Sequence, residues 1–245
     1  MVKINKLVSV ARTTEVDTVS DRLIIEYNKN DWSSDSNMVS LFTELKNVSD
    51  RITAAINRIK AESTLEEKDE LRDGIIKSIN YLVMGNLYHP DNAIKEAAAA
   101  VNEVFENYGL RIISESYSTE SSLIESLLLD FQNEALQPSI EAIPQLTELI
   151  SNLRTVQTEF EEAKVAFENE KAAQGNEASA TELKKEVLSV INNKIIVYLR
   201  AMVLVNEAVY GSFAQNTAQI IDDMNSIVRK RINNPPSPTE EEGEN

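Results

Sequence analysis

The fold of this chain is decided by the stretch MVSLFTELKNVSDRITAAINRI, residues 38–59. Its apolar residues recur at alternating spacings of three and four, which places them on one stripe of an α-helix. They are Met38, Leu41, Leu45, Val48, Ile52, Ala55 and Ile59. A stripe of this length predicts a long helix that packs against a partner helix.

The same periodicity continues through most of the chain. It predicts further helices over about residues 14–28, 64–88, 91–108, 115–133, 138–171, 181–210 and 212–231. Two overlapping capping boxes, Ser63 with Glu66 and Thr64 with Glu67, predict that a new helix begins there. Pro144 predicts a kink or a later start for the helix over 138–171, and Gly211 predicts that the helix over 181–210 bends or ends there.

Composition agrees with an all-α fold. The 245 residues include only six glycines and six prolines, too few for the turns of a many-stranded sheet. We therefore expect an elongated, antiparallel helical bundle of about eight helices. Trp32 is the only tryptophan and lies in a polar loop, where it either marks an interface or folds back to close the bundle end.

Two halves of the chain show the same order of elements: a short helix, a long seam helix, a capped helix, a break and a last helix. Asn80 and Asn192 occupy matching places in the two halves. This repetition predicts two duplicated four-helix halves, residues 1–110 and 111–232, which either stack or merge into one bundle. The remaining residues, 233–245, are rich in proline and then glutamate, which predicts a disordered acidic tail.

Several segments resemble an uncharacterised all-helical family of gut bacteria, a domain of unknown function. They are Glu67–Asp73, the Tyr108-Gly109 stop, and Tyr117–Glu120 leading into Leu127–Asp130. The resemblance covers about residues 5–232 and implies the fold and a bacterial origin. It implies no activity or ligand.

Charge and residue content argue against several classes of function. The formal net charge of −16 repels nucleic-acid phosphates and anionic membranes. The absence of cysteine rules out disulfides, thiolate metal sites and cysteine nucleophiles. The N-terminus lacks the apolar core of a secretory signal, and the longest apolar run, Ile195–Val205, is too short to span a membrane. We therefore expect a cytoplasmic protein without nucleic-acid or membrane partners.

No catalytic, cofactor or metal constellation can be recognised. The single histidine, His89, cannot supply two Glu-x-x-His motifs of a di-iron site, and its place before Pro90 favours a role at a helix break. The adjacent pairs Asp222-Asp223 and Glu161-Glu162 do not converge on one helix face, so we interpret them as solvated surface charge. We therefore expect no enzyme activity, cofactor or metal.

Four polar residues near apolar faces are the remaining candidates for a ligand cavity: Arg72, Asn80, Asn192 and Arg200. Their alternative roles are structural, as interhelical ion pairs, asparagines that fix helix register, or arginine stems that reach water. The leading hypothesis is a non-enzymatic helical interaction or scaffold protein, with an unknown protein partner or self-association. The alternative is a small-ligand-binding helical bundle with a polar cavity between helices.

Overall fold

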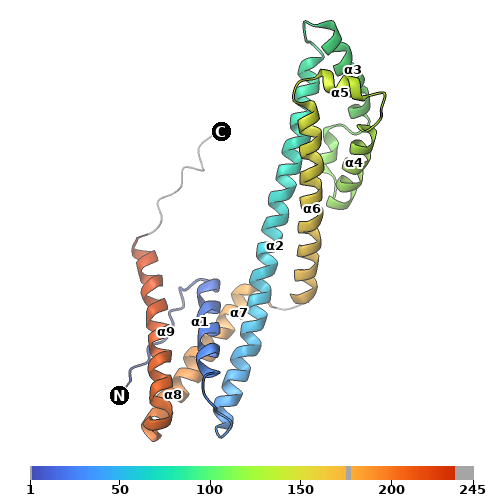
Figure 1. The fold of residues 1–245 in the computed structure, drawn as a ribbon. Coiled ribbons are helices and arrows are strands. Elements are labelled where there is room, and N and C mark those ends of the chain that lie inside the picture. The colour runs from blue at the N-terminus through green and yellow to red at the C-terminus, as the bar shows by residue number, and fades with distance from the viewer. Residues whose placement is uncertain (1, 175–177, 235–245) are drawn as a thin grey trace. The chain divides into compact units, whose positions relative to one another are not determined.

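The structure, a computed structural model, describes residues 2–174 and 178–234 and confirms the all-α class (Figure 1). No β-strand occurs in these residues. The helices are α1 Thr13–Tyr27, α2 Ser36–Asn86, α3 Asn92–Glu106, α4 Tyr117–Asp130, α5 Gln137–Ala142, α6 Leu146–Gln174, α7 Ala180–Ser189, α8 Ile196–Val205 and α9 Glu207–Asn233. A 3-10 helix, Leu110–Ser114, precedes α4, and a π-helical turn, Val190–Ile195, joins α7 to α8.

The chain forms two compact units whose boundaries differ from the expected halves. Unit 1 combines residues 1–59 with 172–245, and unit 2 is the continuous stretch Lys60–Lys171. The expected division between residues 110 and 111 therefore falls inside unit 2. The reason is that α2 carries the chain from unit 1 into unit 2, so unit 2 is an insertion rather than a second half. Most of the expected acidic tail, from residue 235, lies outside the described residues.

Helix α2 is unbroken through Ser63 and Thr64, so the predicted helix start at this point is wrong. The Thr64 hydroxyl donates to the Lys60 carbonyl, 3.0 Å away and one turn earlier in the same helix. This bond satisfies the side chain inside a helix, an arrangement that a capping-box pattern does not distinguish from a true helix start. The stripe ahead of this point packs as expected from Met38 to Ala55, whereas Ile59 is 49% exposed.

Unit 1 is held together by antiparallel contacts of its helices. Helix α1 packs against α2 through the Ser20 and Ser49 hydroxyls, 2.8 Å apart. Helix α2 in turn meets α7 where Arg51 Nη1 lies 3.0 Å from Glu186 Oε2. Trp32 has folded back into this core: it is 6% exposed and its indole N–H donates to the backbone of the preceding helix. The remaining core comes from the N-terminal segment, α7, the π-helical turn, α8 and α9.

Helix α8 ends at Val205 and is followed by Asn206, so the helix boundary does not lie at Gly211. The Asn206 side chain caps α9 by accepting from the Val209 N–H at 3.3 Å, and Gly211 continues within that helix. The stretch Ala180–Val205 meets the length and composition test for a membrane span, with 44% of its most apolar window buried in the protein. Core helices of folded proteins pass the same test, and Ile195 and Leu199 are fully buried in the unit 1 core.

Unit 2 consists of the second part of α2 together with α3, α4, α5 and α6. Helix α6 begins at Leu146, two residues after Pro144, so the predicted delay of this helix is confirmed. It runs antiparallel to α2, since Lys68 Nζ pairs with Glu159 Oε2 at 2.8 Å. The core of the unit includes Ile76, Val101, Phe105, Ile124, Leu127 and Leu153.

Candidate functional site

The most polar point in the interior of unit 2 is Arg72, whose side chain is fully buried. Its guanidinium Nη2 lies 2.8 Å from Asp69 Oδ1, one turn earlier on α2, and 2.8 Å from Glu120 Oε2 on α4. Nη1 donates to Ser121 Oγ and Gln157 Oε1, at 3.0 and 3.1 Å. These contacts join three helices, α2, α4 and α6, around one cation.

An aromatic ring completes the surroundings of Arg72. The guanidinium carbon lies 3.6 Å from the centroid of the Phe160 ring, which is itself fully buried. A guanidinium at this distance over a ring face gains from the cation–π interaction, and more so away from water. Arg72 is therefore an interhelical ion-pair residue, one of the structural roles that its sequence position left open.

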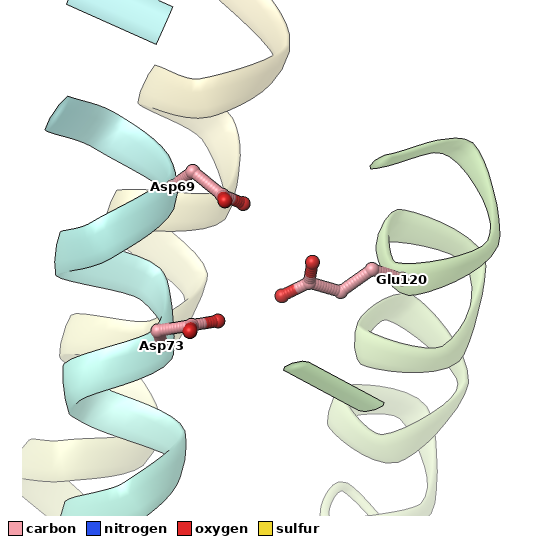
Figure 2. Close-up of side chains that lie close together, drawn as sticks. All are labelled: Asp69, Asp73 and Glu120. Atoms are coloured by element: carbon pink, nitrogen blue, oxygen red, sulfur yellow. The ribbon is translucent and has the colours of Figure 1, made fainter. Parts of the chain in front are cut away.

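Three acidic side chains lie close to one another beside Arg72. Asp69 and Asp73 lie one turn apart on α2, and Glu120 points toward them from α4 (Figure 2). Burial raises the pKa of Glu120 to about 7; the Arg72 cation opposes this rise, and the charges of Asp69 and Asp73 add to it. Burial also raises the pKa of Asp69, despite its ion pair with Arg72. We call Asp69, Arg72, Asp73 and Glu120 the charge cluster.

The other three predicted residues do not join Arg72. Asn80 is half-buried and lies eight residues further along α2, about 12 Å at 1.5 Å per residue. Asn192 and Arg200 belong to unit 1, so the four side chains are divided between the two units.

Asn192 and Arg200 hold the N-terminal segment instead. From the π-helical turn, Asn192 accepts from the Leu7 N–H at 2.8 Å and donates to the Leu7 carbonyl at 2.9 Å. Arg200 donates to the Ile4 carbonyl. Asn225 on α9, not singled out from the sequence, pairs in the same way with the Val8 N–H and the Lys6 carbonyl. Its position between the apolar Ile221, Met224 and Val228 of α9 is the signal that could have indicated a buried amide.

The surface of unit 2 carries an apolar and small-residue stripe along α2, which continues into Tyr88 in the turn after this helix. Its members recur at spacings of three and four and are all exposed. We call them the α2 stripe: Leu71, Gly74, Ser78, Tyr81, Gly85 and Tyr88. Beside it lies a groove of about 680 Å³ between α2 and the start of α6, lined by Ser78, Tyr81, Leu82, Gln145, Glu148, Leu149 and Asn152.

The fold and the charge cluster thus define an all-helical protein with a buried ionic network. The family model described as "Family of unknown function (DUF6261)" matches residues 62–225, more than half of the 245, so the chain belongs to this family. This match confirms the resemblance to a family of unknown function. No curated protein and no solved structure matches the chain.

Proposed function

We propose that this protein is a non-enzymatic helical interaction protein that binds a helix of another protein along the α2 stripe. The observation that supports this proposal is the exposure of large side chains at regular helical spacing. Tyr88 is 84% exposed, Tyr81 66% and Leu71 47%. Tyrosine is enriched in protein interfaces, where its ring contributes a large contact area at a small entropic cost.

The small residues of the stripe favour a helix as the partner. A Cβ atom built on Gly74 or Gly85 would meet nothing within 4 Å, so both positions face open space. Together with Ser78 they leave shallow places between Leu71 and the tyrosines. Apolar side chains of a facing helix, spaced three and four residues apart, would pack into these shallow places.

Charge favours a basic partner over a second copy of this chain. Glu67 and Glu70 are exposed near the N-terminal end of the stripe, and the whole chain carries −16. Two copies would repel each other, whereas a helix with lysine or arginine beside its apolar face would be attracted. We therefore assign the stripe to a basic amphipathic helix of another protein.

Site-specific cross-linking tests this proposal. A photoreactive amino acid replaces Tyr81, Tyr88 or, as a control, Glu103, which is exposed on α3 of the same unit. We expect a common cross-linked partner at Tyr81 and Tyr88 and none at Glu103, with the cross-linked peptide being a basic amphipathic segment. Loss of a tyrosine anchor should weaken binding by at least tenfold, since aromatic hot spots contribute about 2 kcal/mol or more.

Three results would overturn the assignment. The first is equal cross-linking at all three positions, and the second is binding that survives Tyr81→Lys and Gly85→Leu together. The third is a cross-link between two copies, with a dimer in sedimentation, which would replace the basic partner by self-association.

The groove beside the stripe favours a second candidate, binding of a small polar molecule. Its volume lies in the range of about 300–1,000 Å³ typical of ligand sites. The amide and carboxylate groups of Gln145, Glu148 and Asn152 offer both donors and acceptors. Asn152→Leu separates the two candidates, because it should abolish a ligand-induced rise in melting temperature and leave cross-linking at Tyr88 unchanged.

Three finer expectations remain proposals beside this function. The resemblance supports a bacterial, gut-associated source, and the acidic charge supports a cytoplasmic location without nucleic-acid or membrane partners. The matching sequence surroundings of Asn80 and Asn192 support an internal duplication. Fractionation of the source cells with an antibody against the chain would test the location.

A further inference from the structure

The charge cluster contains buried polar atoms without a hydrogen-bond partner, among them the donor Arg72 Nε as well as two carboxylate oxygens. Within the described residues, Glu120 Oε1 and Asp73 Oδ1 are buried and have no hydrogen-bond partner. Glu120 as a whole is only 1% exposed. A buried acceptor without a partner costs about 1–3 kcal/mol, so these two oxygens indicate a group that the described side chains do not supply.

Three carboxylate groups of the charge cluster lie close together. Asp69, Asp73 and Glu120 each offer one carboxylate oxygen, and the three oxygens lie within 4.8 Å of one another. Figure 2 shows Glu120 extending from α4 into the space in front of the two aspartates of α2. The spacing of Asp69 and Asp73 places both on one helix face, so the three groups share a common centre.

The charge balance calls for a cation. When Glu120 is ionised, three carboxylates and one buried guanidinium sum to −2 (three negative charges and one positive). Lys77 Nζ reaches Asp73 Oδ2 at 3.4 Å, but its side chain is 44% exposed and screened by water. On α6, Glu161 accepts from Gln157 Nε2 at 3.4 Å and adds no positive charge.

We propose that Asp69, Asp73 and Glu120 bind a divalent cation of the calcium type. Ca²⁺ takes carboxylate oxygens at about 2.3–2.6 Å, so two ligands on opposite sides of it lie up to about 5 Å apart. Oxygens within 4.8 Å of one another fit this ion without rearrangement. Mg²⁺ demands near-ideal octahedral geometry with bonds of about 2.0–2.1 Å, whereas Ca²⁺ accepts irregular sets of oxygen ligands, which favours an ion of the calcium type.

Arg72 and the cation use different oxygens of Glu120. The guanidinium already occupies Glu120 Oε2 and Asp69 Oδ1. Glu120 Oε1 and Asp73 Oδ1 remain for the cation. The ion would therefore add to the Arg72 network rather than replace it, and this inference is independent of the α2 stripe.

Calorimetric titration of the full-length protein with calcium chloride tests the proposal. The protein is first treated with a chelator, and the titration is run at pH 8, where Glu120 is ionised. We expect saturable binding of one ion per chain, in the range of about 10⁻⁴–10⁻³ M for a site with few protein ligands. Glu120→Gln and Asp73→Asn should each weaken it at least tenfold, and Glu103→Gln on α3 should leave it unchanged.

Two further measurements make the result decisive. Circular dichroism of each variant shows that the helices remain folded, and titration at pH 6 should give weaker binding because protons compete for Glu120. No saturable heat below about 10 mM calcium, or undiminished binding in both cluster variants, would overturn the proposal. Equal affinity for magnesium would overturn the assignment to a calcium-type ion.

Discussion

Replacing Arg72 by methionine is expected to destabilise unit 2 strongly. Methionine keeps most of the volume of the side chain and its contact with Phe160, but it removes the cation that pairs with Glu120 and Asp69. Glu120 has only 2% of its side chain exposed, so its charge would remain buried without a partner. Breaking a buried ion pair in this way costs about 3–5 kcal/mol.

The cost should depend on pH, and its direction follows from Glu120. The pKa of Glu120 in the folded protein is about 7, above its ordinary value of 4.5, so the folded state holds this proton more tightly than the unfolded state. Stability from this group is therefore greatest below pH 4.5 and is lost as the pH rises toward 7. The loss in the unmodified protein is about 3 kcal/mol, from a pKa difference of about 2.5 units. Without Arg72 the pKa rises further, so the variant should lose more stability at pH 8 than at pH 5.

Urea unfolding followed by far-ultraviolet circular dichroism measures this effect at pH 5 and pH 8. Arg154→Met, at an exposed position on α6, is the matched control and should change the free energy of unfolding by less than about 0.5 kcal/mol. The double variant Arg72→Met with Glu120→Leu should recover most of the loss, because the most deeply buried carboxylate is removed together with its cation. A cost below about 1 kcal/mol at pH 8, or the same cost at both pH values, would refute the reasoning.

Three other substitutions test separate features. Asn225→Ala should cost about 2–4 kcal/mol in the free energy of unfolding, since it leaves the Val8 N–H and the Lys6 carbonyl without partners; a cost below 1 kcal/mol would contradict this. Gly109→Ala should cost about 1–3 kcal/mol, because φ is +63° and ψ 178° there. Gly85→Ala, within α2, should instead stabilise the protein by about 0.5–1 kcal/mol. Thermal melting should therefore show a lower melting temperature for the first variant and a higher one for the second.

The local signals in the sequence predicted most of the helices. Asp91 caps α3 through the Ala93 N–H, and Ser179 forms a capping box with Glu182 at the start of α7. The seam from Met38 to Ala55 packs into the core as its spacing indicates. Capping and periodicity act over a few residues, so one sequence suffices to recognise them.

The long-range arrangement could not be predicted in the same way. Nothing local distinguishes the continuous helix at Thr64 from a helix start, and the insertion of unit 2 into unit 1 depends on that continuity. In the site, a carboxylate partner for a buried Arg72 was expected on physical grounds. Asp69, three residues away, could have been named, but Glu120 is separated from Arg72 by 48 positions and is brought near only by the packing of α4 on α2.

The insertion of unit 2 has a consequence for synthesis on the ribosome. Unit 1 needs α7–α9, which follow the 112 residues of Lys60–Lys171 (171 − 60 + 1). At roughly 5–20 residues per second, synthesis of unit 2 takes roughly 6–22 s, and α7–α9 are made only after it. During this interval the apolar face of α1 and early α2 lacks its partners, while unit 2 has its whole sequence and folds first. Slower translation between codons 60 and 171 would lengthen this exposure and increase the demand for chaperones that shield nascent apolar helices.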